Sequence, residues 1–191
     1  MKRILPVLAV WTLAVVLPAR AQQVDIEQLA ETCRGCHGDS ENLPVDPTYP
    51  IIAGQEFYYL YVQLRDFKSG LRENETMQGV VADLDRETLK AIAQYWSEKP
   101  WPKTNFPAPS EKDVRLAEQA VTSAECTACH LGDFRGSSRV PRLKNQQPGY
   151  LEKTMKDMKE QRRRNSPNMM ALFKTFPDEW IEALARYLAA L

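Results

Sequence analysis

The chain has 191 residues, and its 25 basic and 25 acidic side chains leave no formal net charge at pH 7. Apolar residues make up 43% and charged residues 26%, a composition that excludes a disordered or fibrous chain. The balanced charge also argues against a general nucleic-acid-binding protein, whose domains are normally strongly basic. With only two histidines and four cysteines, soft metal ligands are scarce.

The first 21 residues have the pattern of a secretory signal peptide. Lys2 and Arg3 precede the uncharged run 4–19, and the A-R-A sequence that ends at Ala21 fits a signal-peptidase site. A retained membrane anchor is the alternative, but 16 residues at about 1.5 Å each are shorter than a hydrocarbon core of roughly 30 Å. The sequence therefore predicts cleavage after Ala21, export to the periplasm and a mature chain from Gln22.

The mature chain reads as a tandem repeat. Equivalent residues recur 91 to 93 positions apart: Cys33 with Cys126, Pro50 with Pro141, Tyr59 with Tyr150, Asn74 with Asn165, Met77 with Met169 and Tyr95 with Tyr187. An offset that drifts by one or two residues indicates a duplicated module with small insertions. The segment 97–113 between the copies contains four prolines, which predict an extended spacer. We therefore expect a signal peptide at 1–21 and two domains, at 22–106 and 107–191.

Both copies are predicted to be all-helical. Helices are expected near 24–35, 55–69 and 86–98 in the first copy, and near 111–128, 148–163 and 178–190 in the second. The last helix of each copy has apolar residues at i, i+3, i+4 and i+7: Leu89, Ile92, Ala93 and Trp96 in one, Ile181, Leu184, Ala185 and Leu188 in the other. Asp85 is the expected cap of the first of these helices, and Pro177 stands just before the second.

Each copy contains one C-x-x-C-H sequence, the attachment signature of c-type haem. One helical turn presents two thiols to the two haem vinyl groups, and the following histidine directs a ring nitrogen at the iron. The sequence therefore predicts two covalently bound haem c groups. The expected thioether residues are Cys33, Cys36, Cys126 and Cys129, and the expected iron ligands are His37 and His130.

Three other uses of these residues compete with haem attachment. Redox-active C-x-x-C pairs normally occur in a βαβ context, which the sequence lacks. A shared four-cysteine zinc site would require the two copies to converge on one ion and leaves both histidines unexplained. Two structural disulfides fit an exported protein, but they also leave the repeated histidine without a role.

The second axial ligand of each iron is predicted to be a methionine, because both histidines and all cysteines are already used. Met77 is the single methionine of the first domain. In the second domain Met155 and Met158 replace apolar residues on a helix face and are expected in the core. Met169 is equivalent to Met77 and is the preferred ligand, with Met170 as the alternative.

The mature chain resembles the cytochrome c4 family of two-domain, dihaem class I c-type cytochromes. The resemblance rests on the two C-x-x-C-H sites and on a run in the first half: YPIIAGQ (49–55), then Tyr59, Gln63, Leu64, Phe67, Lys68, Gly70, Arg72, Asn74 and Met77. It implies an all-α fold of two tandem class I cytochrome c domains, each wrapped around one haem c. It further implies that the carbonyls of Pro50 and Pro141 accept hydrogen bonds from the haem-ligating histidines, which would orient the rings.

The second half departs from the family pattern. Leu131 replaces the glycine that usually follows the haem-binding histidine, and VPRLKNQ (140–146) replaces P-x-L-A-G-Q. Because only glycine enters positive φ without strain, a changed loop conformation is expected there.

Charge also divides unevenly between the halves. Residues 22–106 contain 14 acidic and 8 basic side chains, and residues 107–191 contain 11 and 14. Three of the basic residues of the second half are arginines in the segment 161–164. They would neutralise haem propionates, as Arg72 would in the first domain, or dock an acidic partner. The alternative is a solvated basic surface.

The leading functional hypothesis is an electron carrier, not an enzyme, that moves one electron per haem between exported or membrane-bound redox proteins of a respiratory or related chain. The implied partners are a cytochrome bc complex, a haem–copper terminal oxidase or a periplasmic dehydrogenase, with peripheral membrane association left open and nucleic acid excluded. One alternative is a fixed electron-transfer subunit of a periplasmic oxidoreductase, for example in sulfur-compound oxidation. The other is a haem enzyme with a labile sixth ligand, which no spare histidine, cysteine or acid–base pair supports.

Overall fold

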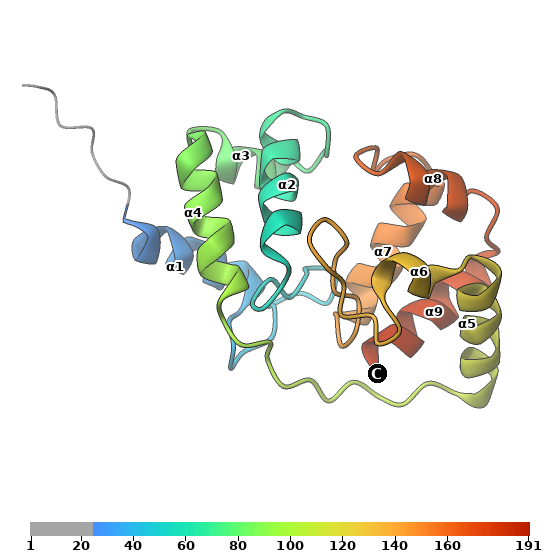
Figure 1. The fold of residues 1–191 in the computed structure, drawn as a ribbon. Helices are drawn as coiled ribbons and strands as arrows, with labels where there is room; N and C mark the ends of the chain where they lie inside the picture. Colours follow the sequence, from blue (N-terminus) through green and yellow to red (C-terminus); the bar gives the residue numbers. More distant parts are fainter. Residues whose placement is uncertain (1–24) are drawn as a thin grey trace, which may run out of the picture.

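The structure, a computed structural model, describes residues 25–191, so the expected signal peptide lies outside the described residues. Within this range the chain folds into helices in two groups joined by an extended segment (Figure 1). The first group contains α1 (Ile26–His37), α2 (Phe57–Lys68), α3 (Glu75–Val81) and α4 (Arg86–Ser97). The second contains α5 (Glu111–Ser123), α6 (Cys126–His130), α7 (Pro148–Lys159), α8 (Pro167–Phe173) and α9 (Asp178–Ala189).

The all-α prediction is confirmed, since the only β-type pairing between residues 25 and 191 is one isolated bridge, Ser137 with Val140. None of the helices in this part of the chain is long and apolar enough to cross a membrane. The proline-rich residues 100–110 form neither helix nor strand, as predicted, and run as an extended strap from the end of α4 to the start of α5 (Figure 1).

Side-chain caps explain where several helices begin. The carboxylate of Asp85 accepts a hydrogen bond from the Thr88 N–H at 2.8 Å, so the predicted cap of α4 is confirmed. At the start of α5, Ser110 and Asp113 cap each other's backbone N–H groups in a capping box. These caps satisfy N–H groups that the first helical turn leaves without partners.

Each group of helices has its own hydrophobic core. Leu89, Ile92, Ala93 and Trp96 of α4 are buried in the first core, and Ile181, Leu184, Ala185 and Leu188 of α9 are buried in the second. This confirms the apolar faces expected from the sequence. The most extensively packed helix pairs, such as α2 with α4 and α5 with α9, each lie within one group. The two halves therefore fold around separate cores.

Two short helices were not expected from the sequence, and one expected helix is broken. α3 and α8 are only seven residues long, too short for an apolar periodicity to be read. The expected helix at 111–128 ends at Ser123, and the chain passes through a left-handed residue, Glu125 (φ 48°), before α6 begins. In the first half a single helix, α1, runs through the equivalent C-x-x-C-H sequence.

The break accounts for the larger repeat offset at the haem motif. The core-facing residues of α1, Leu29 and Ala30, match Ala120 and Val121 of α5 at an offset of 91. The cysteines match at an offset of 93, so the second half has two additional residues between the helix and its haem motif. The chain absorbs them by interrupting the helix at Glu125.

The loop after the second haem motif has a changed conformation, as expected: Phe134, Gly136 and Ser138 have positive φ, whereas in residues 38–50 of the first half only Gly38 does. The first position of the loop nevertheless keeps a positive φ without glycine. Gly38 has φ 65° and its counterpart Leu131 has φ 67°. Glycine is replaced at two further positions with positive φ. Gly54 (φ 69°) corresponds to Asn145 (φ 58°), and Gly70 (φ 75°) corresponds to Gln161 (φ 62°). The second half thus holds side chains in a left-handed region that normally favours glycine.

Candidate functional site

The first C-x-x-C-H sequence forms the last turn of α1. The Cys33 side chain is half-buried against the first core, with its Sγ 3.5 Å from the Leu29 carbonyl oxygen, while Cys36 is exposed. In the second half α6 repeats this arrangement, with Cys126 half-buried and Cys129 exposed. Burial raises the pKa of the Cys33 and Cys126 thiols, so both are protonated at neutral pH.

The competing uses of these cysteines find no support in the structure. None of the four is joined in a disulfide. Between residues 25 and 191, no group of three or more His, Cys, Asp or Glu side chains is placed to hold a metal ion, so the shared zinc site is not formed. The two motifs lie in separate halves, one next to each core.

Both histidine rings are held by a proline carbonyl, as the resemblance implied. The Nδ1 atom of His37 lies 2.9 Å from the Pro50 oxygen, and that of His130 lies 3.1 Å from the Pro141 oxygen. A carbonyl can only accept, so Nδ1 carries the hydrogen and Nε2 keeps a free lone pair. Burial lowers the pKa of both rings, which leaves them neutral and able to bind a metal through Nε2.

The candidate methionines occupy equivalent helices. Met77 is the third residue of α3, packs against the first core and donates its backbone N–H to the Asn74 side chain at 2.9 Å. Met169 is the third residue of α8, and both it and Met170 pack against the second core half-buried. Met155 and Met158 are buried inside that core on α7, which confirms the packing role predicted for them.

A polar cluster lies between the two halves. Arg163, with 7% of its surface exposed, donates to the Tyr59 hydroxyl at 3.1 Å and to the Gln63 amide oxygen at 3.0 Å. Arg72 donates to the same Gln63 oxygen at 2.9 Å and to the Tyr150 hydroxyl at 3.3 Å. Each arginine therefore reaches a tyrosine of the other half, and neither has a carboxylate partner within 4 Å among residues 25–191.

The other two arginines of the 161–164 segment behave as surface residues. Arg162 pairs with Asp157 at 2.7 Å, and Arg164 pairs with Glu73 of the first half. Arg162 and Arg164 therefore belong to a solvated basic surface. Arg163 is the exception, because a buried cation without an anion is costly unless a ligand compensates it.

The residues present fit haem c. The cluster between the halves contains the guanidinium groups of Arg72 and Arg163, neither of which is paired with a carboxylate. The indole N–H of Trp101 is also buried without a hydrogen-bond partner. Haem propionates would supply the missing negative charge and hydrogen-bond acceptors. With thiols and a free Nε2 in each half, the chain offers every group that covalent haem attachment requires. When bound, haem supplies an iron that changes oxidation state by one electron.

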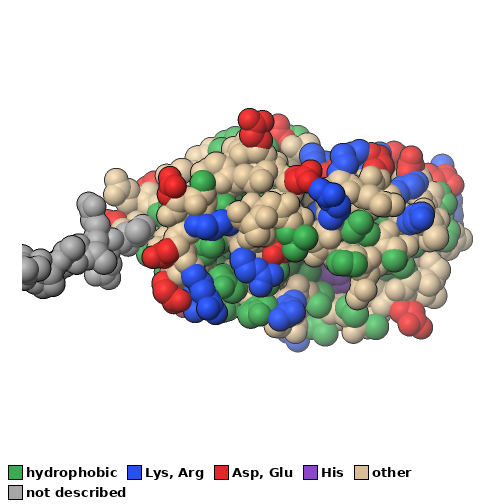
Figure 2. All heavy atoms as spheres, turned by 90° about the horizontal axis from the view of Figure 1, so that it is seen from above, with side chains coloured by type: hydrophobic (Ala, Val, Ile, Leu, Met, Phe, Trp, Pro, Cys, Tyr) green, Lys and Arg blue, Asp and Glu red, His purple; other side chains and the backbone are tan. Residues whose placement is uncertain are grey.

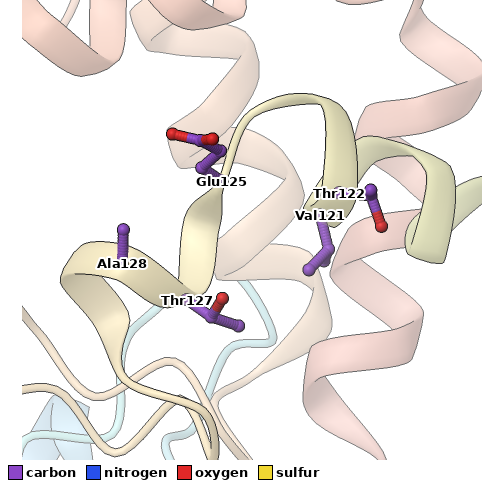
Figure 3. A pocket seen from close by; sticks show the side chains of 5 residues that line it. All are labelled: Val121, Thr122, Glu125, Thr127 and Ala128. Atoms are coloured by element: carbon purple, nitrogen blue, oxygen red, sulfur yellow. The ribbon is translucent and has the colours of Figure 1, made fainter.

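An open pocket of about 520 Å³ marks the break before α6 (Figure 3). It is lined by Val121 and Thr122 from α5, by Glu125, and by Thr127 and Ala128, the two middle residues of the second motif. Glu125, where the helix is interrupted, is therefore part of the pocket lining. It contains neither the histidine nor the methionines predicted as iron ligands.

Sequence reasoning missed several residues that connect the halves. Trp101 lies in the proline-rich spacer, and the Arg142 guanidinium lies over its ring, 4.3 Å from the ring centroid. Gln55 of the first half donates a hydrogen bond to the Arg142 carbonyl. Gln146 of the second half donates one to the Ile51 carbonyl. The only available signal was that Gln55 ends the YPIIAGQ run and recurs as Gln146 at an offset of 91.

Comparisons with known proteins agree with this arrangement, although no protein-family profile matches the chain. The chain is 31% identical over 187 residues to cytochrome c4 of Thiocapsa roseopersicina, covering 91% of this chain and 96% of that protein. It is 30% identical over 196 residues to the thiosulfate dehydrogenase electron acceptor of Stutzerimonas stutzeri, covering 92% and 90%. A solved cytochrome c4 from Acidithiobacillus ferrooxidans superimposes with a TM-score of 0.73 at 26% identity, covering 84% of this chain and 99% of that one.

Proposed function

The chain belongs to the cytochrome c4 family and is a dihaem electron-transfer cytochrome, and we propose that it relays electrons, one per haem, between redox proteins outside the cytoplasm. The observation that carries the proposal is the pair of C-x-x-C-H turns, each with its histidine ring fixed by a proline carbonyl. Fixed axial ligands favour electron transfer, because little structure has to rearrange when the iron changes charge.

In this proposal each domain binds one haem c through its own cysteine pair. Cys33 and Cys36 form the thioethers of the first haem, and Cys126 and Cys129 form those of the second. His37 and His130 bind the two irons through Nε2. The neutral rings and their fixed orientation support this role, and the domains at 22–106 and 107–191 each contain a complete set of ligands.

Met77 and Met169 are the proposed second axial ligands. Their equivalent places, as the third residues of α3 and α8, favour Met169 over Met170. Iron that is bound on both faces offers no open position for a substrate. That saturation supports the role of an electron carrier and disfavours the haem-enzyme alternative.

We place the protein in the periplasm, exported by a signal peptide that is removed after Ala21. A relative with 30% identity is named as the electron acceptor of a thiosulfate dehydrogenase, so a periplasmic dehydrogenase of that kind is the proposed electron donor. A cytochrome bc complex is the other proposed donor, and a haem–copper terminal oxidase is the proposed electron acceptor.

Stopped-flow mixing with a purified thiosulfate dehydrogenase and thiosulfate tests this proposal. The oxidised protein should accept two electrons per chain, which would appear as full reduction of both haems. As a control, omission of thiosulfate should leave both haems oxidised. Reduction by dithionite without any reduction by the dehydrogenase would rule out this donor, and uptake of fewer than two electrons would rule out the dihaem carrier.

A further inference from the structure

The two helices that carry the proposed methionine ligands begin in different ways. In the first half the Asn74 side chain accepts a hydrogen bond from the Met77 N–H at 2.9 Å, so α3 is capped by a residue of its own half. Asn165 is the equivalent residue of the second half, but its side-chain amide donates to the Gln63 amide oxygen and to the Asp66 carboxylate, both at 2.9 Å. Both acceptors lie on α2, in the first half. Among the described residues, the N-cap side chain of α8 makes no capping hydrogen bond.

The asparagine is the position at which two otherwise similar segments differ. One position earlier, Glu73 and Arg164 pair with each other across the junction of the two halves. Two positions earlier, an arginine of each half donates to a tyrosine of the other half. Asn74 bonds within its own half, however, whereas Asn165 bonds to the other half. In Figure 1 the loop before α8 points toward α2, in agreement with these contacts.

Asp66 is the acceptor that makes the contact from Asn165 strong. Only 2% of the Asp66 side chain is exposed, and its second oxygen accepts from Arg65 at 2.9 Å. A hydrogen bond to a buried carboxylate stabilises more than one between neutral groups. On the face drawn in Figure 2, acidic and basic side chains are intermingled over both halves, so no single-sign patch on that face draws the halves together. The junction therefore depends on individual bonds of this kind.

The second half makes no reciprocal contact. Asp157 is the counterpart of Asp66, 91 positions further along the chain. Among the described residues its carboxylate pairs with Lys153 and Arg162, both in the second half, and with no residue of the first half. The first half therefore fixes the start of α8 in part, whereas the cap of α3 does not involve the second half.

We propose that Asn165 is a positioning residue for the methionine that binds the second iron, and that the first half fixes this ligand through Asp66. The proposal rests on the proposed function, in which a methionine of α8 binds that iron. Asn165 stands four residues before Met169, and α8 has only seven residues, so its position depends on the contacts at its ends. A short helix that is fixed less firmly moves away more often, and its methionine then competes less well with an added ligand.

Substitutions at the two ends of the bond test the proposal in the haem-loaded protein. Asn165→Ala removes the donor from the second half, and Asp66→Ala removes the acceptor from the first half. Asp66→Asn keeps an oxygen that can accept from the Asn165 amide and is the conservative variant. Asn74→Ala and Asp157→Ala are the matched controls, because they make the same changes at the equivalent positions of the other halves.

Imidazole titration of the ferric protein measures how readily each iron exchanges its methionine. Proton NMR resolves the two haems, and Met77→Ala identifies the resonances of the first. Asn165→Ala and Asp66→Ala should each raise the imidazole affinity of the second iron by about tenfold, as expected for the loss of one hydrogen bond to a charged group. The first iron should change less than about twofold. The double variant should add little to either single one, because both remove the same bond.

The controls should give the opposite pattern. Asn74→Ala should raise the imidazole affinity of the first iron and leave the second unchanged, because it removes the cap of α3. Asp157→Ala should leave the first iron unchanged, since its partners lie in its own half. Asp66→Asn should behave nearly as the wild-type protein does.

Backbone amide hydrogen exchange gives a readout that does not depend on the iron. The amides of α8 should exchange faster in Asn165→Ala and Asp66→Ala than in the wild-type protein, while those of α3 should not. A merely structural role of the bond would instead speed exchange throughout both halves and would not single out the second iron.

An unchanged imidazole affinity of the second iron in both Asn165→Ala and Asp66→Ala would overturn the proposal. An equal rise at both irons would also overturn it, because a general loosening of the protein would then be the cause. Where Asp66→Ala does not fold, Asn165→Ala decides the question. If the second iron of the wild-type protein binds imidazole as readily as that of Met169→Ala and of Met170→Ala, the ligand in the proposed function is wrong; hydrogen exchange of α8 then still shows whether Asp66 fixes that helix.

Discussion

The side chain of Gln146 in the second half hydrogen-bonds to both backbone polar groups of Ile51 in the first half. The Gln146 Oε1 atom accepts from the Ile51 N–H at 2.8 Å, and its Nε2 donates to the Ile51 carbonyl at 2.9 Å. Gln55 holds Arg142 in the same way, at 2.7 and 3.0 Å. Arg142 is the repeat equivalent of Ile51, and Gln146 is that of Gln55, each 91 positions further along the chain. The halves therefore meet through the same surface of each copy, as the subunits of a two-fold symmetric dimer do.

Gln146→Ala should therefore destabilise the protein by about 2–4 kcal/mol, because it leaves the buried N–H and carbonyl of Ile51 without partners. Chemical denaturation followed by circular dichroism measures the change in free energy of unfolding. The control is Gln94→Ala on the exposed surface of α4, which should cost less than about 0.5 kcal/mol. Equal effects of the two substitutions would show that the bonds between Gln146 and Ile51 contribute nothing to stability.

Leu131→Gly should stabilise the second domain by about 1–3 kcal/mol, since it removes the strain of a side chain at φ 67° and ψ 164°. Leu131→Ala is the matched control: it removes nearly the same side chain but keeps the Cβ, so it should not stabilise. Thermal unfolding of the two variants gives the comparison. A midpoint for Leu131→Gly at or below that of Leu131→Ala would mean that the backbone is not strained there.

The reverse change in the first half should be damaging. A Cβ atom added to Gly38 would lie 2.2 Å from the Asn42 carbonyl oxygen, far inside contact distance. We expect Gly38→Ala to lower the thermal midpoint clearly, whereas Gly35→Ala, where a Cβ meets nothing within 4 Å, should not. The same unfolding experiment checks both, and a harmless Gly38→Ala would contradict the tight turn seen after α1.

The sequence was sufficient to predict the parts of the fold that have a strong local signal. The apolar faces of α4 and α9 and the cap at Asp85 depend on residues close together in the chain, and all three are confirmed. α3 and α8 have too few turns to show a periodicity. The break at Glu125 depends on a two-residue insertion that disturbs no apolar pattern.

For the site, the repeated motif predicted the cysteines and histidines, and the family resemblance predicted the hydrogen bonds from the two histidine rings to the carbonyls of Pro50 and Pro141. The cluster formed by Arg72, Arg163 and two tyrosines could not be predicted, because it forms only when the two halves meet. The loss of glycine after His130 predicted a changed loop, but not that Leu131 itself would keep a positive φ.

Asp113 should make stability fall at low pH. Its hydrogen bonds from Arg186 and Ser110 lower the pKa of the carboxyl from 3.8 to about 2. A folded-state pKa below the unfolded value means that the contribution is complete above about pH 4 and is lost as pH falls toward 2. Asp113→Asn should lower the denaturation midpoint at pH 5, and the gap from the wild-type protein should narrow by pH 2. A gap independent of pH would exclude this linkage.

Met77→Ala and Met169→Ala should each keep both haems attached but open one iron to added imidazole or cyanide. The reason is that a methionine is the proposed ligand on the face opposite each histidine. Ligand titrations followed by absorption spectroscopy, together with the loss of one thioether–iron band in the ferric protein, measure this. Met170→Ala is the control and should behave as the wild-type protein does; if it opened the second iron while Met169→Ala did not, the assignment would pass to Met170.

Each half of this chain carries one covalently attached haem. The pyridine haemochrome assay on acid–acetone-extracted protein, normalised to protein concentration, measures it most directly. We expect two haem equivalents per chain, and one equivalent in the Cys33→Ala/Cys36→Ala variant. A wild-type value below two, or haem that the extraction removes, would contradict it.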